Sequence, residues 1–96
     1  MNSIDEAISV VRGTNWGLRN RAEVYLAAHA SLETLQPLAT DSDWKIRLSA
    51  VRAIAQFPGP SAAAHGLLRR CLSNETDDWV TRNLQWGLTN HSERGG

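Results

Sequence analysis

The sequence has one cysteine, one lysine and no long hydrophobic run. Because Cys71 stands alone, no disulfide can form within the chain, which is typical of proteins from a reducing compartment. No apolar stretch approaches the roughly 20 residues that a membrane-spanning helix needs, and the amino terminus has no basic segment followed by a hydrophobic block. We therefore expect a cytoplasmic protein without a membrane partner.

The chain of 96 residues also has no net charge, since ten basic residues balance ten acidic ones. This balance excludes a global electrostatic attraction to nucleic acid or to an anionic membrane, although a local basic patch remains compatible with it. Lys45 is the single lysine, and this bias fits either a functional arginine surface or the base composition of the genome. A hydrophobic fraction of 42% is usual for a folded protein, so we expect one domain over residues 1–96.

Patterns that indicate catalysis or metal binding are missing from the sequence. His29, His65 and His91 are dispersed, without the spacing of metal ligands to one another or to Cys71. No nucleophile elbow is present, and no glycine-rich loop follows a strand pattern. We therefore predict a protein that is not an enzyme and that needs neither a cofactor nor a metal ion.

One short motif occurs three times in the chain. Each copy is a small or acidic polar residue, then tryptophan, two variable residues and arginine: Asn15-Trp16-x-x-Arg19, Asp43-Trp44-x-x-Arg47 and Asp78-Trp79-x-x-Arg82. Each copy begins a segment of helical periodicity and follows another such segment, which predicts three helical hairpins at about 3–29, 31–57 and 61–90. A single hairpin cannot bury its apolar face alone, so stacking of the hairpins must supply the core. Residues 91–96 are predicted to be a frayed tail.

The middle copy, "DSDWKIRLSAVRAIAQF", resembles the second-helix signature of HEAT repeats, in the short HEAT-like type found in phycobilin lyases and many bacterial scaffolds. The resemblance rests on Asp41, Ile46, Arg47, Ala50, Ala53 and Ile54. It implies an all-α fold, a right-handed α-solenoid of three stacked helical hairpins with six helices. It also implies that Asp41 and Arg47 link turn and helix between neighbouring repeats. Gly13 and Thr76 stand where the other copies would place the turn aspartate, so a continuous ladder of such links is not expected.

The repeated tryptophans allow two interpretations. At the first turn of a second helix, each ring can cover the end of its hairpin core while its N–H reaches a loop carbonyl. Alternatively, Trp16, Trp44 and Trp79 lie exposed along one edge, where tryptophan and arginine dominate binding energies. We assign a structural role in the repeat to six residues: Trp16, Arg19, Asp41, Trp44, Arg47 and Arg82.

Candidate binding residues lie on the second helices, which the resemblance places on the concave surface. Arg21, Lys45 and Arg52 face away from the predicted core, and such a basic groove would suit an acidic peptide. Trp86 lies seven positions after Trp79 and outside the apolar stripe of the last helix, which indicates self-association, for example as a homodimer, or a bound partner. The candidate partner-binding residues are Arg21, Lys45, Arg52, Gln56, Trp79 and Trp86.

These features predict a small scaffold or adaptor that binds another protein through its concave, arginine-bearing face or its tryptophan-bearing edge. The alternative is a nucleic-acid-binding module that uses arginine and tryptophan, because some HEAT-like proteins, including a family of alkylpurine glycosylases, cradle DNA. A third function implied by the repeat type is that of a lyase or chaperone for a linear tetrapyrrole. The sequence shows no distinctive cysteine, histidine or acidic pocket for that role.

Overall fold

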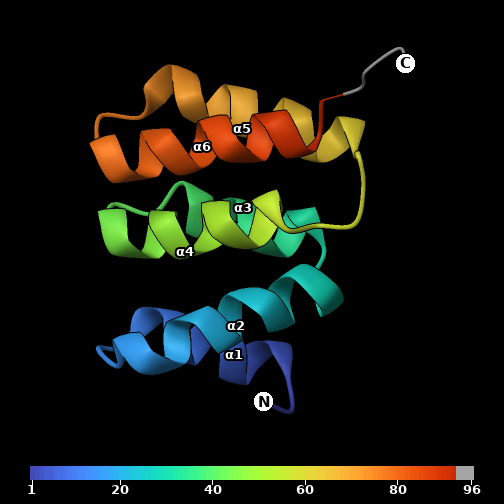
Figure 1. Ribbon diagram of the computed structural model, residues 1–96. Helices are drawn as coiled ribbons and strands as arrows, with labels where there is room; N and C mark the ends of the chain where they lie inside the picture. The colour runs from blue at the N-terminus through green and yellow to red at the C-terminus, as the bar shows by residue number, and fades with distance from the viewer. Residues whose placement is uncertain (93–96) are drawn as a thin grey trace.

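The computed structural model describes residues 1–92, which form three antiparallel helical hairpins stacked one on the next (Figure 1). Within these residues every regular element is an α-helix. The helices are α1 (Ile4–Arg12), α2 (Trp16–His29), α3 (Leu32–Ala39), α4 (Trp44–Ala55), α5 (Ala62–Asn74) and α6 (Asp78–Asn90). The predicted all-α solenoid of three hairpins is therefore confirmed.

Each helix begins directly after a side chain that caps its first turn. Serine, asparagine or aspartate oxygens accept a backbone N–H at every one of these starts, which satisfies a donor that the helix itself leaves free. The capping residues are Ser3, Asn15, Ser31, Asp43, Ser61 and Asp77. In α3, Pro37 lies inside the helix, which ends two residues later. The sequence thus fixes the helix starts through local hydrogen bonds.

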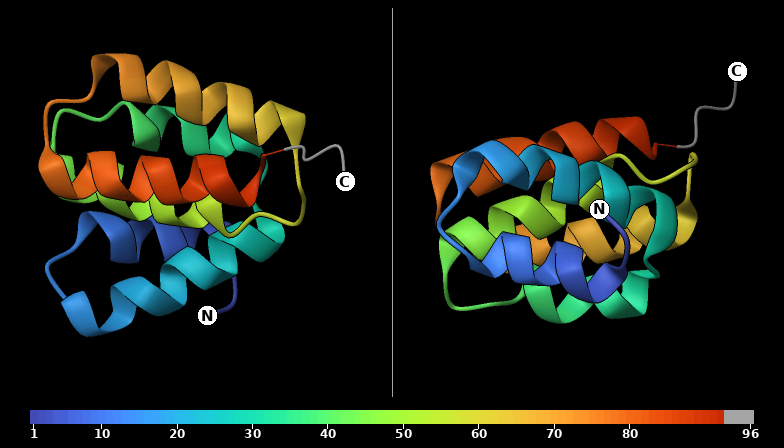
Figure 2. Two further views of the ribbon diagram at one scale, coloured as in Figure 1. Left: turned by 45° about the horizontal axis from the view of Figure 1, so that its top comes forward. Right: turned by 90° about the horizontal axis from the view of Figure 1, so that it is seen from below.

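The six helices form two layers, one of first helices (α1, α3, α5) and one of second helices (α2, α4, α6), as Figures 1 and 2 show. All three second helices begin on the same side of the molecule, at the left in Figure 1. Helix α4 packs closely against both α2 and α6, whereas α3 contacts α5 less and α1 does not pack against α3 to any comparable degree. The second helices are therefore closer together and form the inner side of the solenoid.

The core is a single cluster of small and branched aliphatic side chains that runs through all three hairpins. Its largest fully buried members are Val11, Leu26, Leu35, Val51, Ile54, Leu68, Val80 and Leu84. The close approach of α6 to α4 depends on Gly87, where an added Cβ would lie 2.8 Å from Leu68 Cδ1 and 3.0 Å from Ala55 Cβ. Small residues therefore set the spacing of the second and third repeats.

Replacing Gly87 with alanine should lower the free energy of unfolding by about 1–2 kcal/mol, because overpacking a tight core outweighs the helical gain over glycine. The matched control is Gly66→Ala in α5, where an added Cβ meets only Arg70 Nη1, at 3.9 Å. That variant should be more stable than the parent by about 0.5–1 kcal/mol. Urea unfolding followed by circular dichroism measures both, and equal shifts of the two variants would contradict the packing assigned to Gly87.

The last described residues differ from the predicted frayed tail. His91 is 1% exposed, and its ring lies between the ends of three helices. The backbone N–H of Ser61 donates to His91 Nδ1 at 3.0 Å, and His91 Nε2 lies 2.8 Å from the backbone oxygen of Ile54. The tail assignment is therefore wrong for His91, and the rest of the predicted tail from residue 93 lies outside the described residues.

Candidate functional site

The exposed side of α2, α4 and α6, here called the second-helix face, carries all four tryptophans of the chain. Counted from the capping residues, Trp16 and Trp44 are the first residues of their helices, whereas Trp79 is the second residue of α6. Their exposed fractions are 53% for Trp16, 36% for Trp44 and 61% for Trp79. The role predicted for them as covers of the hairpin core is therefore wrong, and they lie exposed along one edge.

Trp86 lies further along α6 on the same face and is 42% exposed. Its position follows from its neighbours on the helix, because Asn83 and Asn90 both reach α4. Asn83 Oδ1 accepts a hydrogen bond from Arg52 at 3.2 Å, and Asn90 Nδ2 donates to the backbone oxygen of Ala55 at 3.2 Å. Trp86 lies three residues after Asn83 and four residues before Asn90, so it neighbours both on the helix surface and borders α4. Elsewhere on α6, the polar residues Thr81, Gln85 and Thr89 are half-buried or exposed.

The basic residues of the second-helix face differ in their exposure to solvent and in their contacts. Arg21, Lys45 and Arg82 are exposed, and the Arg82 guanidinium lies 5.8 Å from the centre of the Trp79 ring. The side chain of Arg52 is only 37% exposed. Gln56, which was predicted to bind a partner, is half-buried and donates from Nε2 to the backbone oxygen of Arg52.

Arg52 joins the second helices of all three repeats. Its Nε donates to Glu23 Oε1 of α2 at 2.8 Å, and its Nη1 donates to Asn83 Oδ1 of α6 at 3.2 Å. Glu23 is buried, so its carboxylate depends on this ion pair. The sequence prediction placed Arg52 away from the core as a candidate binding residue. It missed Glu23 and Asn83, which no motif in the sequence marks as partners of Arg52.

Arg19 occupies the fourth position of α2, where its side chain is almost fully buried. The guanidinium donates to the backbone oxygen of Gly13 at 3.1 Å, and to Lys45 O and Ser49 Oγ of the next repeat, both at 2.9 Å. Its Cζ lies 4.6 Å from the centre of the Trp16 ring, a favourable cation–π distance. Arg19 thus ties its own turn to the following repeat.

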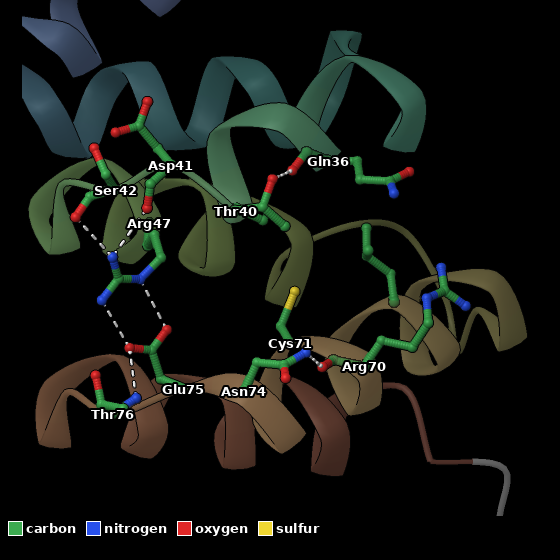
Figure 3. Close-up of a pocket in the computed structure, with 12 residues that line it drawn as sticks. Gln36, Thr40, Asp41, Ser42, Arg47, Arg70, Cys71, Asn74, Glu75 and Thr76 are labelled. Atoms are coloured by element: carbon green, nitrogen blue, oxygen red, sulfur yellow. Dashed lines mark hydrogen bonds and ion pairs between the residues drawn. The ribbon is translucent and has the colours of Figure 1, made fainter.

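Arg47 has the same position in α4 and likewise ties its own turn to the following repeat (Figure 3). Its Nη1 donates to the backbone oxygens of Asp41 and Ser42 at 2.9 and 3.1 Å. Its Nε and Nη2 donate to the two carboxylate oxygens of Glu75 in the next repeat, at 3.0 and 2.9 Å. Burial raises the pKa of Glu75, but the hydrogen bonds from Arg47 and from the N–H groups of Asp77 and Thr76 outweigh it and lower this pKa.

The acidic residues of the turns keep a constant spacing to the helix caps and not to the tryptophans. Glu75 stands two residues before the cap Asp77, as Asp41 stands two before the cap Asp43, and both accept the backbone N–H of that cap. The Asp41 carboxylate also pairs with Arg12 of the first repeat, at 3.3 Å. An alignment on the caps would therefore have identified Glu75, whereas the tryptophan alignment pointed to Thr76.

The structural role predicted for Arg82 is wrong for the same reason. Helix α6 begins one residue earlier relative to its tryptophan, so Thr81 and not Arg82 occupies the position of Arg19 and Arg47. Arg82 is exposed and makes no link between repeats within the described part of the chain.

A pocket of about 550 Å³ lies on the other side of the molecule, between α3 and α5 (Figure 3). The Arg47–Glu75 pair forms one of its walls and Cys71 another. Burial raises the pKa of the Cys71 thiol, with a further rise from Glu75, so the thiol is a weak nucleophile there.

In residues 1–92 no three histidine, cysteine, aspartate or glutamate side chains are grouped to hold a metal ion. No helix in that range combines the length and apolar character needed to cross a membrane.

Comparison with known proteins identifies the repeat. A family model described as HEAT repeats matches residues 4–89, which includes all three hairpins. No curated protein and no solved structure matches the chain. Helical solenoids of this kind serve as protein-interaction scaffolds, since their stacked repeats create an extended inner surface for binding. The length of the match, together with three stacked hairpins linked by arginines from repeat to repeat, shows that the chain belongs to the HEAT-repeat family.

Proposed function

We propose that the protein is a small adaptor, without catalytic activity of its own, that binds another protein on its second-helix face. The observation that carries this proposal is the exposure of all four tryptophans on the layer of second helices. Tryptophan exposes a large apolar area and dominates the energy of many interfaces, together with arginine. Exposed Val24 of α2 and half-buried Leu48 of α4 extend this apolar surface across the three repeats.

Nucleic acid is the alternative ligand for a surface of arginine and tryptophan. The protein ligand is better supported because acidic residues border the face. Asp43 and Asp78 are exposed at the amino-terminal ends of α4 and α6, where they would repel a phosphate backbone that follows the row of tryptophans.

The Trp79→Ala/Trp86→Ala variant should lose at least ten-fold in affinity for the partner, because truncating a central interface tryptophan commonly costs about 2 kcal/mol. The measurement is capture of the partner from a lysate of the source cells with the tagged chain, before and after nuclease treatment, with quantification of the bound protein. Both tryptophans are exposed, so the melting temperature should change little.

The control variant Glu33→Ala/Gln36→Ala changes two exposed residues of α3 on the opposite layer and should retain the partner. Capture that disappears on nuclease treatment would reject protein binding in favour of nucleic acid. Light scattering of the purified chain tests whether the partner is a second copy of the same chain. A dimer that dissociates in the tryptophan variant would identify a second copy as the partner.

A further inference from the structure

We infer that the partner presents an acidic, apolar segment to the second-helix face and that Arg52 receives one of its carboxylates. This inference rests on the proposed function and specifies the chemistry of the partner. It is carried by the charges of the face, by the geometry of Arg52 and by the spacing of the two tryptophans of α6.

The exposed basic residues of the second-helix face, three in number, outnumber the two exposed acidic residues at its edge, Asp43 and Asp78. Arg21, Lys45 and Arg82 are exposed on α2, α4 and α6, and the guanidinium of Arg52 lies between them. Of the acidic residues, Glu23 is buried, whereas Asp43 and Asp78 lie at the amino-terminal ends of α4 and α6, where the helix dipole favours an anion. Asp43 precedes Arg52 by nine residues and Asp78 precedes Asn83 by five, so both stand apart from the guanidinium. Because the whole chain has no net charge, the positive charge of this face is a local feature that complements an acidic partner.

Arg52 is already oriented for a carboxylate. Glu23 holds its Nε and Asn83 holds its Nη1, so the guanidinium is fixed from both neighbouring helices. Within residues 1–92 the two N–H groups of Nη2 have no hydrogen-bond partner, and the side chain is 37% exposed. A fixed guanidinium with free donors binds a carboxylate with little further loss of conformational entropy.

Trp79 and Trp86 place an apolar contact beside this arginine. They lie two turns apart on α6, a rise of about 10 Å along the helix axis, so both rings are exposed on one side of the helix. Asn83 lies between them in sequence and is the residue that binds Arg52. An apolar side chain on these rings would therefore bring a nearby carboxylate of the same segment to Arg52.

The three second helices also limit the length of the segment. Neighbouring packed helices are about 8–10 Å apart, so an extended segment crosses all three with about six residues. A short linear segment with both acidic and apolar residues fits these dimensions.

Selection from a random library of 12-residue peptides displayed on phage, against the immobilised chain, tests this inference. Enriched peptides should carry net negative charge and at least one aromatic or large aliphatic residue. Fluorescence anisotropy of a labelled enriched peptide should then show at least ten-fold tighter binding than its counterpart with every aspartate and glutamate changed to the amide. Enrichment of neutral or basic peptides, or of none, would overturn the inference.

Matched variants locate the contact. Arg21→Gln/Arg82→Gln removes two exposed charges of the face, and Glu23→Gln/Arg52→Gln removes the central ion pair without leaving Glu23 unpaired. Each should reduce the preference for the acidic peptide over its amide counterpart by at least five-fold. Arg69→Gln, an exposed arginine of α5, should leave it unchanged, and an equal loss in that control would overturn the assignment.

The two proposals fail in different ways. If Trp79→Ala/Trp86→Ala releases the partner while acidic and amide peptides bind equally, the adaptor function stands and the inference of an acidic segment is rejected. If a twelve-nucleotide single strand of thymidine binds more tightly than the enriched peptide, with affinity that falls steeply with salt, both proposals are rejected in favour of nucleic acid.

Discussion

Replacement of Arg47 by methionine should lower the free energy of unfolding by about 3–5 kcal/mol, which is a large part of the stability of a domain of this size. The side chain of Glu75 is only 4% exposed, so the variant leaves a carboxylate in the protein without its cation. The backbone oxygens of Asp41 and Ser42 lose their donor at the same time. Urea unfolding at neutral pH, followed by circular dichroism, measures the difference.

The double variant Arg47→Met/Glu75→Gln should recover much of that loss, because most of the penalty comes from the unpaired charge. Lys45→Met, two residues away and exposed, serves as the control and should change stability by less than about 0.5 kcal/mol. A double variant as unstable as the single one would show that the arginine acts through the turn and not through Glu75.

Acid unfolding gives a second readout of the same pair. The pKa of Glu75 is lower in the folded protein than in the unfolded chain, so the unfolded state takes up its proton first as the pH falls. The stabilisation is complete above the unfolded pKa of about 4.3 and is lost as the pH falls towards the folded value. Glu75→Gln should therefore show a shallower loss of stability below that pH than the parent protein.

The architecture could be predicted from the sequence because it depends on local signals. Capping residues, the turns around Gly13 and Pro58, and the apolar periodicity all act over a few residues, and each specifies the start or the end of one helix. The triple repeat then required the hairpins to stack, because a lone hairpin has nowhere to bury its apolar side.

The candidate site could be predicted only in part, because its contacts join residues far apart in the chain. Arg52 was placed on the correct face, but its partners Glu23 and Asn83 are separated from it by 29 and 31 positions. The tryptophan alignment also assigned Arg82 the role of Arg47, although the cap at Asp77 shifts α6 by one residue. One residue of shift turns a helix by about 100°, which is enough to move a side chain from an interface between repeats to solvent.

Replacement of His91 by alanine should lower the free energy of unfolding by about 3–5 kcal/mol, from the cavity that it leaves and from the loss of buried hydrogen bonds. The sequence pattern hides this role, because the apolar periodicity ends at Leu88 and the residues beyond it have the composition of a tail. In the fold the ring instead fills the junction between the end of α4 and the start of α5, and its Nδ1 is the acceptor for the N–H of Ser61.

Two histidine variants test whether His91 closes the third repeat onto the second. His91→Asn supplies a short side-chain acceptor for Ser61 and should recover part of the loss caused by alanine. His65→Ala changes a half-buried histidine of α5 that makes no side-chain hydrogen bond in the described residues. This variant should lower the free energy of unfolding by less than about 1 kcal/mol. Thermal unfolding should rank the proteins as parent, His65→Ala, His91→Asn and His91→Ala in order of falling stability. A His91→Ala protein as stable as His65→Ala would mean that the helices α4 and α6 hold the third repeat by their own packing, without the histidine.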